Sequence, residues 1–143
     1  MPWILDTDHL SILQLRNQPE YLKLRQKLAE VPETDVFASI ISFQEQVQGW
    51  LEYLKRARDA SGVLRAYKEM QSVLRYYCES SVLPFDQVAQ GQFDSLRGQR
   101  IRVGTLDLRI ASIALASGSI LLSRNQRDFR KVPGLRVVDW TRS

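Results

Sequence analysis

The sequence Trp3-Ile4-Leu5-Asp6-Thr7-Asp8 places three apolar residues directly before two carboxylates that flank a hydroxyl. The apolar run is typical of a short strand that is buried on both faces of a parallel sheet. Because a charge is costly inside such a strand, Asp6 is expected where the strand ends and the next helix begins. Ligands bind at this carboxyl edge of open α/β sheets, so Asp6 is a candidate site residue. The alternative is that Asp6, Thr7 or Asp8 only caps the following helix.

Composition predicts one soluble globular domain over residues 1–143, with 44% hydrophobic and 25% charged residues. No apolar run approaches the ~18 residues of a membrane span, and no secretory signal precedes the first strand. The single cysteine, Cys78, cannot form an internal disulfide, and both features favour a cytoplasmic location. Since His9 is the only imidazole, Cys78 is expected to be a buried, unreactive thiol rather than a nucleophile.

Charge is distributed unevenly along the chain. Residues 97–143 contain 10 basic and 3 acidic residues, a net charge of +7, whereas residues 1–96 contain 10 basic and 13 acidic residues, a net charge of −3. Nine of the ten C-terminal basic residues are arginine, whose planar guanidinium suits phosphate. This pattern favours an acidic substrate held near a metal, and the alternative is an ordinary solvated surface.

Apolar segments that fit strands alternate with segments of helical periodicity. Strands are predicted at residues 3–5, 35–40, 82–85, 119–122 and 136–139, and helices at residues 9–16, 19–29, 86–96 and about 105–117. A helical hairpin is predicted over residues 47–77, with its interruption at Ser61-Gly62. The alternation favours an α/β fold: three layers, α/β/α, around a central, mainly parallel sheet of four to five strands. The hairpin is long, so part of it is a candidate oligomer interface.

Two further carboxylates follow predicted strand ends or begin predicted helices. Ser42 and Glu45 fit the capping-box pattern Ser-x-x-Glu, in which Glu45 bonds back to the Ser42 backbone. The alternative is that Glu45 points at the same sheet edge as Asp6. Asp107 lies in the first turn of a helix dense in small and apolar residues, where the helix dipole favours a carboxylate.

The predicted topology brings Asp6, Glu45 and Asp107 together although they are far apart in the sequence. Side by side without a counterion, such carboxylates repel one another, and at least one tends to stay protonated. A divalent cation removes this repulsion. A ligand set of oxygens, with no cluster of histidine or cysteine, favours Mg²⁺ or Mn²⁺ over Zn²⁺.

The chain resembles PIN-domain ribonucleases and, more narrowly, the VapC-type toxins of type II toxin–antitoxin systems. Each matching motif is weak alone, but together they span nearly the whole chain in the right order. The motifs are Leu5-Asp6-Thr7-Asp8, Ile41-Ser42 through Glu45, Asp107-Leu108-Arg109-Ile110-Ala111 with Ala114-Leu115, Leu122-Ser123-Arg124-Asn125 through Asp128-Phe129, and Val132-Pro133-Gly134-Leu135 followed by Val138-Asp139-Trp140.

The resemblance implies a Mg²⁺- or Mn²⁺-dependent endoribonuclease in which Asp6, Glu45 and Asp107 are the catalytic, metal-binding acids. The family often has a fourth acid just after the last buried strand. Here that position is Asn125, which offers an oxygen but no charge, and Asp128 follows three residues later. Both are candidate metal ligands, and the missing charge bears on whether a second metal binds.

Other residues are expected around the metal ligands. Thr7, Asp8 and Ser123 are expected to orient the carboxylates or the phosphate, with Asp8 partly compensating for the uncharged Asn125. His9 is expected to be a helix residue rather than a general base. The candidates for contact with the RNA backbone are Arg109, Arg124 and Arg127, whose alternative role is surface charge.

The resemblance also implies partners and leaves rivals open. The implied partners are an RNA substrate, a cognate antitoxin whose tail fills the active site, and a second copy in a homodimer, with no membrane. One rival is a catalytically silent PIN scaffold that binds RNA or protein. The other is a haloacid-dehalogenase-type phosphatase, with Asp6 as nucleophile and Asp8 as acid/base. Against it, the region after Ser123 lacks a suitable lysine followed by an acidic Gly-Asp-type loop.

Overall fold

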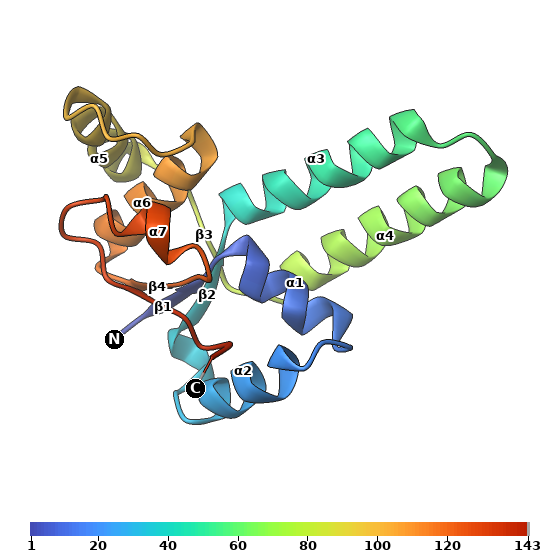
Figure 1. The fold of residues 1–143 in the computed structure, drawn as a ribbon, viewed down its shortest axis with the longest axis horizontal. Coiled ribbons are helices and arrows are strands. Elements are labelled where there is room, and N and C mark those ends of the chain that lie inside the picture. Colours follow the sequence, from blue (N-terminus) through green and yellow to red (C-terminus); the bar gives the residue numbers. More distant parts are fainter. Residues whose placement is uncertain (143) are drawn as a thin grey trace.

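The computed structural model describes residues 1–142 and has the predicted α/β architecture (Figure 1). The strands are β1 (Trp3–Leu5), β2 (Val36–Ser39), β3 (Val82–Leu83), β4 (Ile120–Leu122) and β5 (Val137–Val138). The helices are α1 (Thr7–Leu15), α2 (Glu20–Ala29), α3 (Ile40–Arg56), α4 (Ala60–Cys78), α5 (Gln87–Gly98), α6 (Thr105–Ser117) and α7 (Gln126–Phe129), with a 3₁₀ turn, η1 (Glu33–Asp35), before β2.

The sheet has five strands in the order β3-β2-β1-β4-β5, and every pairing is parallel. This confirms the predicted parallel sheet. The strand that the sequence begins with therefore lies at its centre. Leu5 is level with Leu122 in β4, and Ile4 is level with Phe37 in β2, so these strands end at one common edge.

Successive side chains of the strands pack into two separate hydrophobic cores, one on each face of the sheet. Ile4 and Leu121 pack into a core that α5, α6 and α7 cover. Leu5 and Leu122 point to the opposite face and pack against α1, α2 and the sheet end of α4. Since successive side chains of a strand point to opposite faces, a strand that is apolar throughout is buried on both. The structure thus has the three predicted layers.

Helices α3 and α4 form the predicted hairpin, and Figure 1 shows both arms extending side by side away from the sheet. The predicted interruption at Ser61-Gly62 is wrong, because both residues lie in the first turn of α4. The turn comes earlier because the Asp59 side chain caps α4, accepting the Gly62 N–H at 2.9 Å. A capped glycine near a helix start is tolerated, so it does not break the helix here.

Part of the hairpin is exposed. On α4, Tyr77 is buried, but Tyr67 and Leu74 face solvent. The expectation of a buried thiol at Cys78 is also wrong, because this last residue of α4 faces solvent. Among residues 1–142, no helix combines the length and the hydropathy of a bilayer span.

Candidate metal centre

Asp6 lies where β1 ends, as the sequence predicts. Its backbone N–H still pairs with Leu122 of β4, at 2.9 Å, while its carboxylate Oδ1 accepts the Thr7 N–H at 2.8 Å. Asp6 therefore caps α1 and at the same time belongs to the sheet edge, so both interpretations of this residue hold. Its side chain is only 6% exposed, an unusual position for a carboxylate.

Glu45 lies in α3, and the predicted capping box is wrong. The helix begins at Ile40, three residues before the position expected from Ser42-x-x-Glu45, because Ser39 is the cap and accepts the Ser42 N–H at 3.2 Å. The side chain of Glu45 is thus not needed at the helix end. Its Oε1 instead accepts the Thr7 hydroxyl at 2.7 Å.

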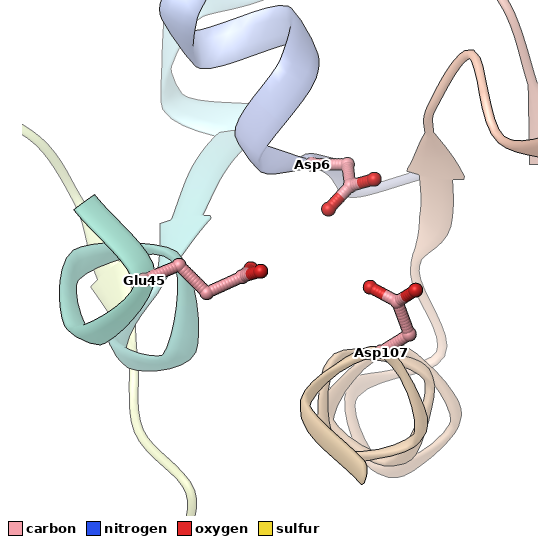
Figure 2. Close-up of side chains that lie close together, drawn as sticks. All are labelled: Asp6, Glu45 and Asp107. Atoms are coloured by element: carbon pink, nitrogen blue, oxygen red, sulfur yellow. The ribbon is translucent and has the colours of Figure 1, made fainter. Parts of the chain in front are cut away.

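Asp107 completes the group from the first turn of α6, which begins after Gly104 without a side-chain cap. One carboxylate oxygen from each of Asp6, Glu45 and Asp107 lies within 4.8 Å of the others. Figure 2 shows the three side chains pointing at one another from three different elements. Among residues 1–142 they form the one group of three or more acids, histidines or cysteines with this spacing.

Burial and neighbouring charges raise the pKa of two carboxyl groups in this cluster. Burial is the main cause that raises the pKa of Asp6 from 3.8 to about 7, and the charge of Asp8 adds to it. Hydrogen bonds from Ser123 and Thr7 oppose this rise without cancelling it. Burial and the charge of Glu45 also raise the pKa of Asp107. A positive charge between the carboxylates would oppose this rise.

The donor set fits Mg²⁺ or Mn²⁺. The three side chains offer only oxygens, the ligands that hard divalent cations prefer. The sole histidine lies elsewhere, with its Nδ1 2.6 Å from Asp8. The repulsion described above also gives a bound cation a physical role, because it compensates the clustered negative charge.

No protein-family model matches the chain, but individual proteins do. A Salmonella typhimurium protein named tRNA(fMet)-specific endonuclease VapC is 26% identical over 144 residues, covering 98% of each chain. A Rickettsia felis protein named Ribonuclease VapC1 is 42% identical over 45 residues, 32% of this chain and 34% of the relative.

Solved structures agree with these relatives. The DNA-bound VapBC structure from Salmonella typhimurium has a TM-score of 0.75 at 21% identity and covers 98% of each chain. VapBC-1 from nontypeable Haemophilus influenzae also has a TM-score of 0.75, at 20% identity, covering 99% of this chain and 100% of the other. The chain is VapC-like in both sequence and fold. The resemblance drawn from its motifs is thus confirmed.

Ser123 and Asp8 lie near Asp6 in the VapC-like chain. The Ser123 hydroxyl, which directly follows β4, donates to Asp6 Oδ2 at 2.7 Å. Asp8 lies outside the group of three carboxylates, and its Oδ2 accepts the Arg124 N–H at 3.0 Å. Its other oxygen lies 2.6 Å from His9 Nδ1, so both oxygens of Asp8 have partners outside that group.

Asn125 and Asp128 bond mainly to each other. Asn125 caps α7, its Oδ1 accepting the Asp128 N–H at 3.4 Å and its amide donating to Asp128 Oδ2 at 3.2 Å. These bonds and Lys131, 3.3 Å away, lower the pKa of Asp128. Neither residue belongs to the cluster of three carboxylates. Their service as metal ligands stays a prediction.

The three candidate RNA-binding arginines lie in different surroundings. Arg124 and Arg127 are exposed beside the loop that carries Ser123. The guanidinium of Arg109 is half-buried and lies 5.3 Å from the ring centre of Phe93 on α5, a cation–π contact. Contact of these three arginines with RNA stays a prediction. Arg124 and Arg127 are more exposed than Arg109.

Sequence reasoning missed the contact of Ser42 at this site. Its hydroxyl is fully buried and lies 2.9 Å from Thr7 Oγ1, so it holds the hydroxyl that bonds Glu45. The signal was present in the spacing: Ser39 and Ser42 are three residues apart, and only one of them can cap the helix. The other then lies inside the helix, on the side that faces the site.

The Thr7 hydroxyl is expected to matter for activity through Glu45. Thr7→Val removes the donor 2.7 Å from Glu45 Oε1 while keeping a similar shape. For a metal-dependent ribonuclease with Glu45 as a ligand, which this site predicts, we expect RNA cleavage to fall about 10- to 100-fold. Thr7→Ser keeps the hydroxyl and should cleave like the wild type. Equal rates for both variants, in protein with unchanged circular dichroism, would contradict this role.

Proposed function

We propose that this VapC-like chain is a metal-dependent endoribonuclease and the toxin of a toxin–antitoxin pair. The observation that carries the proposal is the placement of Asp6, Glu45 and Asp107 within 4.8 Å at the sheet edge. The support from comparison is likeness over 98% of the chain to a protein named as an endonuclease VapC. Neither observation alone would suffice, because clustered acids also occur without a metal.

In this proposal Asp6, Glu45 and Asp107 hold Mg²⁺ or Mn²⁺. When bound, the ion supplies charge to stabilise the scissile phosphate and acidity to activate a water. The chain supplies the orientation: Thr7 fixes Glu45 and Ser123 fixes Asp6 through hydrogen bonds of 2.7 Å. Arg124 and Arg127, both exposed near this edge, contact the RNA backbone.

A cognate antitoxin is the proposed protein partner. Solved neighbours include a toxin–antitoxin complex from Klebsiella pneumoniae, at 23% identity with a TM-score of 0.67, and several VapBC complexes. The homodimer and the cytoplasmic location expected from the sequence stay predictions. A single peak of monomer mass in light scattering would remove the homodimer.

Cleavage of total RNA by the purified chain, free of antitoxin, tests the proposal. We expect cleavage with Mg²⁺ or Mn²⁺ and none with a chelator, because the clustered carboxylates need the ion to act. The matched control is Asp94→Asn, which removes one carboxylate from the exposed face of α5 and should cleave like the wild type.

Two outcomes would contradict the proposal. Cleavage that persists in chelator would exclude the metal-dependent site. Folded protein that binds RNA without cutting total RNA or a panel of transfer, ribosomal and messenger RNAs would instead support the catalytically silent scaffold.

A further inference from the structure

The only histidine of the chain joins two segments that the proposed function does not connect. His9 is fully buried in α1. Its Nε2 accepts the backbone N–H of Trp140, at 3.2 Å, from the C-terminal segment. Its Nδ1 lies 2.6 Å from Asp8 Oδ1. Both ring nitrogens of a side chain far from solvent are thus used.

These partners assign the tautomer of His9. A nitrogen that accepts an N–H carries a lone pair, so Nε2 is unprotonated and the ring proton lies on Nδ1. His9 therefore donates to Asp8. Asp139 Oδ1, 3.7 Å from Nε2, is beyond hydrogen-bond distance and instead accepts the N–H and hydroxyl of Thr141. The direction of each bond is fixed.

Asp8, which His9 holds through one oxygen, also bonds the loop after β4. Its other oxygen accepts the Arg124 N–H at 3.0 Å and lies 3.3 Å from the Ser123 hydroxyl. That hydroxyl also accepts the Asn125 N–H, at 3.0 Å, and directs its one proton to Asp6 at 2.7 Å. Hydrogen bonds thus connect Trp140 through His9 and Asp8 to the backbone of the loop after β4, and the Ser123 hydroxyl of that loop bonds Asp6.

We propose that His9 is a positioning residue for the metal site: it holds Asp8, and through Asp8 the Ser123 loop, at the geometry that Asp6 needs. The inference rests on the proposed metal site. The C-terminal segment packs against His9. Trp140 is anchored there by its ring, 4.6 Å from that of Trp3 at the start of β1, and by its N–H on His9.

Two substitutions separate the two bonds of His9. An asparagine amide reaches about where Nδ1 lies, so His9→Asn keeps a donor for Asp8 but loses the acceptor for Trp140. A glutamine amide reaches about where Nε2 lies, so His9→Gln keeps the acceptor for Trp140 but loses the donor for Asp8. Each variant loses one hydrogen bond of His9, whereas an apolar replacement would lose both.

The experiment is calorimetric titration of each folded variant with Mn²⁺ alone, with hydrogen exchange of the Arg124 amide as a second readout. We expect His9→Gln to bind Mn²⁺ about 10-fold or more weakly than wild type and to exchange the Arg124 amide faster. His9→Asn should stay close to wild type in both. The control for lost stability is Leu24→Ala, in a fully buried residue of α2, which should bind Mn²⁺ normally.

The outcomes separate this inference from the proposed function. Wild-type protein that does not bind Mn²⁺ would remove the metal site itself. Two results would overturn the positioning role of His9 and show that it only stabilises the fold. In one, all three variants bind Mn²⁺ as tightly as wild type. In the other, Leu24→Ala also binds Mn²⁺ more weakly, in proportion to its lowered melting temperature.

Discussion

Asp6→Asn is expected to lower RNA cleavage by about 1,000-fold and to make the metal-free protein more stable at pH 8. The loss of activity follows because metal ions supply several kcal/mol of transition-state stabilisation, and each ~1.4 kcal/mol corresponds to tenfold in rate. The gain in stability follows because Asp6 is buried, with its pKa raised to about 7, so its charge opposes folding above that pH. An amide of the same shape removes that charge.

The measurement pairs a cleavage assay with thermal unfolding in chelator at pH 8. Mg²⁺ should raise the melting temperature of the wild type but not that of Asp6→Asn. A variant that keeps wild-type activity would remove Asp6 from the site. A variant that is inactive and also strongly destabilised would mean that the hydrogen bonds to Thr7 and Ser123 outweigh the repulsion.

Without metal, the wild-type protein is expected to lose stability as the pH rises from about 4 to about 7. The pKa of Asp6 rises from its ordinary value of 3.8 to about 7 in the folded chain, so over this range the folded state binds the proton that the unfolded state has released. Stability therefore falls with rising pH. The loss is up to about 4 kcal/mol, at about 1.4 kcal/mol for each pKa unit.

Urea unfolding at pH 5 and pH 8, each in chelator, measures this loss. Other groups titrate in the same range, so the difference between wild type and Asp6→Asn isolates the contribution of Asp6. Saturating Mg²⁺ should abolish that difference at pH 8, because the ion replaces the proton. A wild type that is no less stable at pH 8 than the variant would mean that the Asp6 carboxylate is already compensated within the chain.

The sequence predicted that the three acids lie together, and for two of them the local signal is strong. An apolar run ends at Asp6, and a helix of small residues begins at Asp107. Parallel strands place such ends at one edge, so position in the chain becomes position in space. The position of Glu45 was harder to predict, because both Ser39 and Ser42 suit a helix cap. The choice between them depends on where β2 ends, which is at Ser39.

The remaining features depend on contacts between distant segments. His9 was predicted to be an ordinary helix residue. The C-terminal segment packs over it, and the Trp140 N–H of that segment occupies its second ring nitrogen, Nε2. Cys78 was expected to be buried because free thiols usually are, but as the last residue of α4 it faces solvent. Ser61-Gly62 carries the composition of a turn, yet the capping bond of Asp59 starts the helix before it.

The central position of β1 has a consequence for how the protein is made. Asp6 and its partner Ser123 are 117 residues apart in the sequence. Contacts of this sequence separation form slowly, and Ser123 directly follows β4, the strand that pairs with β1. A growing chain on the ribosome therefore holds Asp6, Glu45 and Asp107 without the strand that aligns them. The proposed metal site is therefore complete only after β4 has been synthesised and has paired with β1.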